Sequence, residues 1–236
     1  MKKHILALAL CVSIALPSCD TLQQAADAYL NEPTLTEIGL GLKQALEFGI
    51  SEGANILSKR DGYFKSVYKI LLPEEARIVT ERLKIIPGFA NLEDVLLEKL
   101  NRAAEDAAKS AAPIFVDAIR EMTFDDALGI LMGPDNAATQ YLHQKTYDPL
   151  YQEFRPVILT SLNKFNAVQY WADAVNAYNK IPFVDKVNPN LDEYVTEKAL
   201  VGLFGMVTQK ELTIRNDLSS RTTDLLKKVF AKQDRK

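Results

Sequence analysis

The stretch M-T-F-D-D-A-L-G-I-L-M-G-P-D-N-A-A-T-Q-Y-L-H, residues 122–143, holds the clearest local signals of the chain. Thr123 and Asp126 have the spacing of a capping box, in which a hydroxyl and a carboxylate satisfy the first N–H groups of a helix. Gly133 is suited to end that helix with a positive φ, and Pro134 is suited to the first turn of another. The stretch therefore predicts two helices that meet at a corner rich in polar side chains.

Apolar residues recur at helical spacing through most of the remaining chain, and no segment shows the convincing alternation of a β-strand. We therefore predict an all-α fold, a single bundle-like domain over residues 34–236 with about nine or ten helices. Pro113 should kink or break the longest pattern, because proline lacks the N–H and clashes one turn back. Asp148 and Pro149 have the pattern of a helix start. Besides the helices at the corner and after Asp148, predicted helices cover residues 34–58, 73–86, 91–122, 166–180, 190–216 and 222–233.

Four glycines interrupt the first of these helices, where each costs up to ~1 kcal/mol relative to alanine. They are Gly39, Gly41, Gly49 and Gly53. Close contact with neighbouring helices is the favoured explanation, and a bend or an opening is the alternative.

Asn91, with an acid three residues later, also has the spacing of a helix cap.

Composition and charge exclude one class of partner. The chain has 236 residues, of which 47% are hydrophobic and 25% are charged, with a formal net charge of −3. Residues 1–18 contain two lysines and no acids, so the remainder has 26 basic and 31 acidic residues. A nucleic-acid-binding protein would show a basic patch or stripe, and we therefore expect no nucleic acid as a partner.

The N-terminus has a short basic region followed by an apolar run, Ile5 to Leu16, which is typical of a signal peptide. The run ends in Leu16-Pro17-Ser18-Cys19, which resembles the lipobox of bacterial lipoproteins. By that resemblance residues 1–18 are a lipoprotein signal peptide and Cys19 is the lipid-attachment residue, carrying acyl chains such as palmitate. An ordinary signal peptide that is cut elsewhere, for example after Ala15, is the alternative.

The lipobox also predicts a location. With an acylated Cys19, residues 19–33 become a tether and the partner is a bacterial membrane. We then expect the protein in the cell envelope, facing the periplasm or the exterior.

Few residues remain for catalysis or metal binding once the signal peptide is removed. The two cysteines are Cys11 and Cys19, and His143 is the one histidine outside the signal peptide. This excludes zinc sites built from Cys or several His. The chain has no P-loop, dinucleotide-binding, nucleophile-elbow or EF-hand motif. We therefore expect no metal and no cofactor.

The polar corner is the candidate site. A relay can be drawn from Asp135, Thr139 and His143, but successive turns of one helix rarely converge on a substrate, so an exposed histidine is favoured. The acids could bind Ca²⁺, although capping explains them without a metal. Arginines that meet these acids would form structural pairs or, alternatively, a pocket for an anion. The candidate residues are Thr123, Asp126, Asp135, Asn136, Thr139 and Gln140, with Arg102, Arg120 and Arg155 as the expected arginines.

Several segments resemble a bacterial envelope family labelled domain of unknown function 4197. They are L-N-R-A-A-E-D-A-A at 100–108, P-I-F-V-D-A-I-R-E-M-T at 113–123, D-A-L-G-I-L-M-G-P-D-N-A-A-T-Q-Y at 126–141, Y-V-T-E-K-A-L-V-G-L-F at 194–204 and D-L-L-K-K-V-F at 224–230. The resemblance spans roughly residues 35–230. It implies a single helical domain and an envelope location, and it supplies no established activity and no catalytic residues.

Two functions remain open from the sequence. The leading hypothesis is a membrane-anchored, non-enzymatic binding or scaffolding module, whose partner is an envelope protein or a small apolar or anionic ligand. The alternative is a hydrolase or lyase of the envelope that uses carboxylates and His143.

Overall fold

Helix α6 (Phe124–Leu131) begins at Thr123, as the capping box predicts. The Asp126 N–H donates to the Thr123 hydroxyl at 3.1 Å, and the Thr123 N–H donates to the Asp126 carboxylate at 3.0 Å. Two N–H groups that the helix itself leaves without acceptors are satisfied in this way. The capping box is therefore confirmed.

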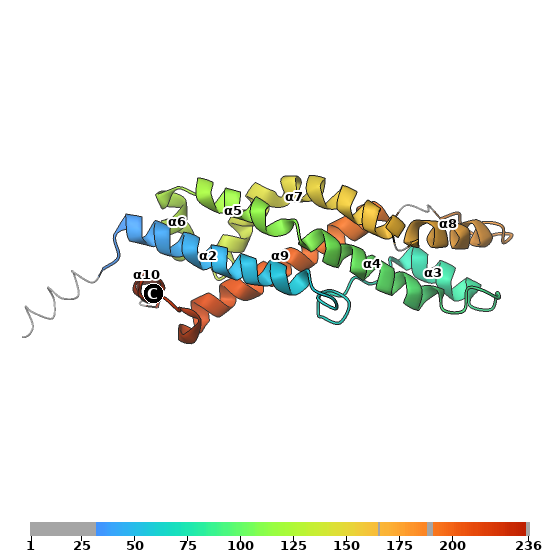
Figure 1. The fold of residues 1–236 in the computed structure, drawn as a ribbon, viewed down its shortest axis with the longest axis horizontal. Coiled ribbons are helices and arrows are strands. Elements are labelled where there is room, and N and C mark those ends of the chain that lie inside the picture. The colour runs from blue at the N-terminus through green and yellow to red at the C-terminus, as the bar shows by residue number, and fades with distance from the viewer. Residues whose placement is uncertain (1–31, 165, 188–190, 235–236) are drawn as a thin grey trace, which may run out of the picture. The chain divides into compact units, whose positions relative to one another are not determined.

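The computed structural model describes residues 32–164, 166–187 and 191–234 (Figure 1). The predicted signal peptide, Cys19 and almost all of the predicted tether lie outside these residues. In the described ranges the chain forms nine α-helices, one 3₁₀ helix and no strand, which confirms the all-α prediction. Besides α6, the helices are α2 (Leu35–Leu57), α3 (Glu74–Leu83), α4 (Leu92–Ala108), α5 (Ala111–Glu121), α7 (Ala137–Lys164), α8 (Ala167–Tyr178), α9 (Asp192–Asn216), η1 (Leu218–Ser220) and α10 (Asp224–Gln233).

The turn between α6 and α7 differs from its prediction. Gly133 does not have a positive φ. Among the glycines in the described part of the chain, only Gly88 does. Gly133 is needed for space instead, since a Cβ there would lie 2.8 Å from the Gly129 carbonyl oxygen. Pro134 lies in the turn before α7 and not in its first turn.

Helix α7 is continuous through Pro149, so the prediction of a new helix after Asp148 is wrong. Leu142 before the proline and Leu150 and Phe154 after it are fully buried. The helix packs along α4, α5 and α9. Burial on both sides of the proline offsets the ~3 kcal/mol that a proline costs inside a helix.

The longest predicted helix divides into α4 and α5, as its proline suggested. The break lies at Lys109 and Ser110, and Pro113 occupies the first turn of α5, where its missing N–H does no harm. Asn91 makes no side-chain cap, contrary to its spacing. The alanine-rich end of α4 is fully buried, which lets other helices approach closely; its buried alanines are Ala103, Ala104, Ala107 and Ala108.

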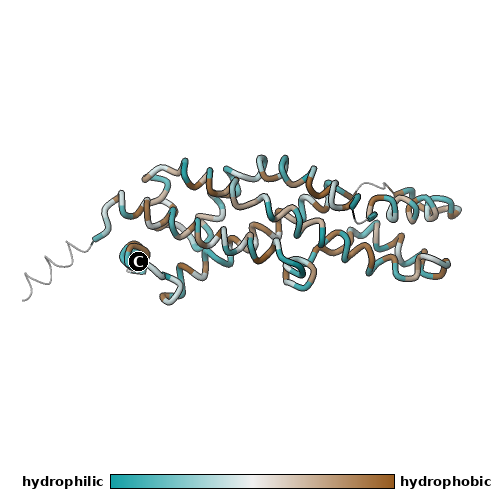
Figure 2. Tube along the Cα trace, in the orientation of Figure 1, coloured by the Kyte–Doolittle hydropathy of each residue, from teal (hydrophilic) through white to brown (hydrophobic). Residues whose placement is uncertain are grey.

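The glycines of α2 mark close helix contacts, as predicted. A Cβ on Gly39 would lie 2.3 Å from the Phe124 ring of α6, and a Cβ on Gly53 would lie 2.9 Å from Met206 of α9. Gly41 faces α10 in the same way. Figure 1 shows α2 running beside α9, and Figure 2 shows apolar and polar positions alternating around the turns of the helices.

We predict opposite effects for two glycine substitutions. Gly41→Ala should lower the free energy of unfolding by about 1–3 kcal/mol, because its Cβ would lie 2.7 Å from a methyl group of Val229, whose branched side chain is stiff. Gly129→Ala, inside α6 with no atom within 4 Å of the added Cβ, should raise it by up to about 1 kcal/mol. Urea unfolding measures both. Equal effects from the two variants would contradict the close contact between α2 and α10.

Candidate functional site

The corner between α6 and α7 is held by a residue that no local sequence pattern singles out. Glu211 of α9 is buried, and its carboxylate accepts hydrogen bonds from the Ala138 N–H at 2.9 Å and the Thr139 N–H at 2.8 Å. It also accepts one from the Thr139 hydroxyl at 2.8 Å. A carboxylate from another helix therefore caps the N-terminus of α7.

Arg215 caps the C-terminus of α6, as Glu211 caps the N-terminus of α7. Its guanidinium donates to the carbonyl oxygens of Ile130 at 2.8 Å and Leu131 at 3.1 Å, the last residues of that helix. It also pairs with Glu211, one turn earlier on α9, at 2.9 Å, and both side chains are almost completely buried. One buried ion pair thus satisfies two helix ends that packing would otherwise leave without partners.

The other corner residues serve local structure. Hydrogen bonds from the Thr123 side chain and backbone hold the pKa of Asp126 below its usual value. Gln140 donates to the Asn136 side chain at 3.2 Å on the exposed face of α7. Asp135 is exposed, and the Asp135–Thr139–His143 relay is not assembled, because Thr139 is bound to Glu211. His143 is exposed and lies against the rings of Tyr147 and Phe204, with centroid distances of 4.9 and 4.6 Å.

None of the three expected arginines pairs with an acid of this corner. Arg120 pairs with Asp117 on the exposed face of α5 at 3.3 Å, and Arg155 pairs with Asp192 of α9 at 2.9 Å. Arg102 belongs to a separate cluster on α4. The expectation that these arginines meet the corner acids is corrected, because Arg215 holds the corner and nearer carboxylates bind the other three.

The Arg102 cluster anchors the loop between α2 and α3. Arg102 binds Asp61 and Glu105 at 2.8 Å each and Glu98 at 3.2 Å. Burial by itself would lower the pKa of Arg102, but the hydrogen bonds to Glu105 and Asp61 raise it. The other Glu105 oxygen accepts the N–H groups of Tyr63 and Phe64, at 3.2 Å each.

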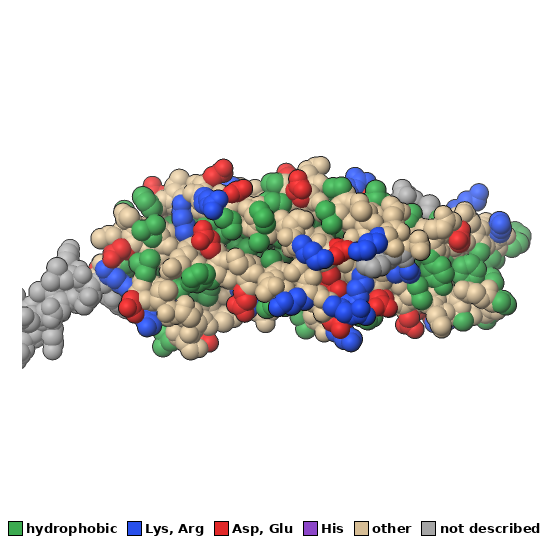
Figure 3. All heavy atoms as spheres, in the orientation of Figure 1, with side chains coloured by type: hydrophobic (Ala, Val, Ile, Leu, Met, Phe, Trp, Pro, Cys, Tyr) green, Lys and Arg blue, Asp and Glu red, His purple; other side chains and the backbone are tan. Residues whose placement is uncertain are grey.

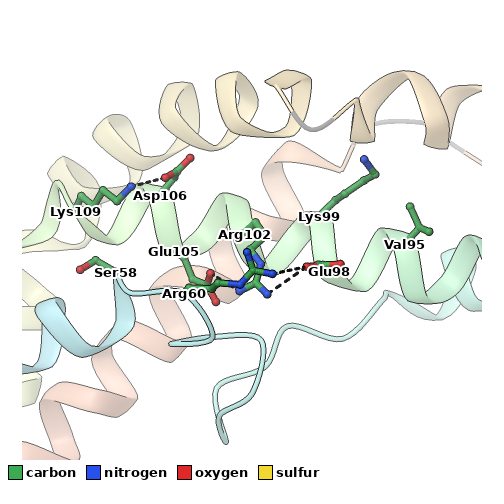
Figure 4. Close-up of a pocket in the computed structure, with 9 residues that line it drawn as sticks. All are labelled: Ser58, Arg60, Val95, Glu98, Lys99, Arg102, Glu105, Asp106 and Lys109. Atoms are coloured by element: carbon green, nitrogen blue, oxygen red, sulfur yellow. Dashed lines mark hydrogen bonds and ion pairs between the residues drawn. The ribbon is translucent and has the colours of Figure 1, made fainter.

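A cavity of about 490 Å³ opens beside this cluster. Figure 4 shows the side chains of Arg60 and Arg102 beside Glu98, and Lys109 paired with Asp106. Arg60, Arg102 and Lys109 each pair with an acid that lines the cavity, so ion pairing explains the cluster, and its role is to position the loop.

A larger cleft of about 690 Å³ lies between α3, α8 and the segment that follows α8. Its lining is mostly apolar or aromatic, with charged residues in addition. Figure 3 shows hydrophobic side chains gathered at the end of the helical unit where Figure 1 has α3 and α8. The apolar lining residues include Ala76, Ile78, Trp171, Tyr178, Phe183, Val184, Val187 and Leu191, and the charged ones are Glu75, Arg82, Asp185 and Lys186.

Two residues of this cleft are unusual. Trp171 is 1% exposed, and its indole nitrogen has no hydrogen-bond partner among the described residues. Buried polar groups without a protein partner are rare, and such groups often bind a water molecule or a ligand. Phe183 is fully exposed and has a φ of 63°, which bulky side chains seldom adopt and which clusters at ligand-binding sites.

The sequence does not predict this cleft, because the helical spacing of Trp171 favours a place in the core. A weak signal lies in Ile181-Pro182-Phe183-Val184, an apolar segment in a predicted loop. In the described residues, no group of three or more His, Cys, Asp or Glu is placed to hold a metal ion. None of the helices in the described ranges combines the length and the hydropathy needed to cross a membrane.

The fold and these sites define an all-α protein with a capped polar corner and an apolar cleft. The family model described as Protein of unknown function (DUF4197) matches residues 32–231, so the chain belongs to this family, as the resemblance predicted. No curated protein and no solved structure matches the chain.

We predict that the corner depends on Glu211 far more than on other acids of α9. Glu211→Ala should lower the free energy of unfolding by about 3–5 kcal/mol, because it leaves Arg215 buried without its carboxylate. Glu197→Ala on the exposed face of the same helix is the control and should change it by less than about 0.5 kcal/mol. Chemical denaturation compares the two, and a loss below about 1 kcal/mol for Glu211→Ala would contradict the capping role.

Proposed function

We propose that this chain is a membrane-anchored protein of the bacterial cell envelope that acts as a non-enzymatic binding module, with the cleft between α3 and α8 as the site for an apolar ligand. The observation that carries the proposal is the cleft itself. Its volume of about 690 Å³ falls within the roughly 300–1,000 Å³ that is usual for small-molecule sites. Its walls are mostly apolar with a few polar groups, which is the usual lining of such sites.

The state of the polar corner supports this choice of site. Glu211 and Arg215 are buried and bound to helix ends, and Asp126 is bound to Thr123. These groups would have to release their structural partners before they could hold a ligand. The cleft needs no such rearrangement of ion pairs, because no ion pair forms between its lining residues in the described part of the chain.

The sequence of the N-terminus supports the anchor. Leu16-Pro17-Ser18-Cys19 follows an apolar run of signal-peptide length. Acyl chains on Cys19 would each contribute about 0.8 kcal/mol per buried CH₂ group, and two or more chains hold a protein firmly on a bilayer.

The anchor predicts the chemistry of the mature N-terminus. We expect the native protein to begin at Cys19 with acyl chains attached, and mass spectrometry of the N-terminal peptide checks this. Cys19→Ser should leave the protein without this modification. An unacylated N-terminus at any other residue would refute the anchor and leave the cleft unaffected.

The cleft predicts binding of an uncharged naphthylamine dye that fluoresces in apolar surroundings. Trp171 is the single tryptophan of the chain and lines the cleft, so a bound dye should receive its excitation energy. Ile78→Glu, which puts a charge into the cleft wall, should weaken dye binding about tenfold. Val201→Glu on α9, an exposed apolar residue outside the cleft, is the matched control and should leave binding unchanged. Equal energy transfer in both variants would refute the cleft as the site.

A further inference from the structure

The cleft is a groove that runs along two helices. Its lining residues extend from Glu75 to Arg82 on α3 and from Trp171 to Tyr178 on α8. At a rise of 1.5 Å per residue, each of these spans covers about 10 Å. A ligand that follows the groove therefore contacts aliphatic and aromatic side chains over about 10 Å.

The rim of the groove is charged, and the floor is not. Two acids and two bases line the cleft, and none of them forms an ion pair with another described residue; they are Glu75, Arg82, Asp185 and Lys186. Such a rim suits a polar head group, and because the two signs are balanced it does not select the sign of the head group. An apolar groove with a polar rim fits an amphiphile.

Resting on the proposed function, we infer that the cleft binds one acyl chain of an amphiphile, with the chain along the apolar floor and the head group at the charged rim. Each CH₂ group taken out of water tightens binding about fourfold, so the several CH₂ groups that lie along the groove strengthen binding together.

The surroundings of the groove favour a bilayer as the source of the chain. Phe183 lies at the groove and is fully exposed, and Ile85, in the loop after α3, is 90% exposed. Figure 1 shows the loops that follow α3 and α8 at the same end of the helical unit. The exposed residues Lys180 and Lys186 lie three positions on either side of Phe183. Exposed apolar side chains with lysines nearby are typical of a surface that lies at a bilayer interface.

Bromine atoms quench a tryptophan that they contact, so acyl chains that carry bromine test the inference at Trp171. The full-length protein is reconstituted into vesicles of saturated phosphatidylcholine. In one arm a brominated fatty acid is added, with a brominated lysophosphatidylcholine in parallel. In the other arm brominated phosphatidylcholine replaces part of the vesicle lipid. Quenching in the second arm assigns a membrane lipid as the source, and quenching confined to the first arm assigns a single-chain amphiphile.

The variants decide whether the chain enters the groove. Ile78→Glu should weaken quenching about tenfold in whichever arm shows it, and Val201→Glu should not change it. Phe183→Asp should weaken quenching in the bilayer arm. Quenching that survives Ile78→Glu would mean contact outside the groove and would overturn the inference. If no brominated chain quenches Trp171 while the naphthylamine dye still binds, the acyl-chain inference fails and the proposed function stands; if the dye also fails to bind, both fail.

Discussion

The buried pair of Glu211 and Arg215 is the interaction on which the rest of this fold depends. Helices α6 and α7 meet at an angle that exposes the carbonyl groups of one and the N–H groups of the other to the interior. A charge of the right sign meets each set, and the two charges neutralise each other on successive turns of α9. The geometry of the corner therefore depends on the position of α9, and α9 in turn packs against α2.

Sequence patterns predicted the parts of the fold that local chemistry controls. The capping box at Thr123 and the division of the pattern before Pro113 follow from residues within a few positions of one another. The glycines of α2 predicted that close contacts exist, but not that Phe124 and Val229 make them. The passage of α7 through Pro149 did not follow, because tertiary burial outweighs a local preference.

The sites were harder to predict, for two physical reasons. The hydrogen bonds that Glu211 and Arg215 make to the corner join residues 72 to 85 positions apart, and no local pattern carries that information. The cleft is a space between helices, and the residues that border it have the same spacing as residues that fill a core. Trp171 fits both roles in the sequence, and only the packing of α3 against α8 separates them. The chain therefore combines a corner whose polar groups are fully paired with a cleft between two helices.

The long sequence separation at the corner has a consequence for the order in which the chain folds. Closing a loop of this length has an entropic cost that must be met before the contact stabilises anything. Because the chain is synthesised from its N-terminus, α6 and α7 exist for some time without the side chains that cap them. Their native junction forms only when α9 has been completed, so a late segment of the polypeptide controls when this earlier corner becomes stable.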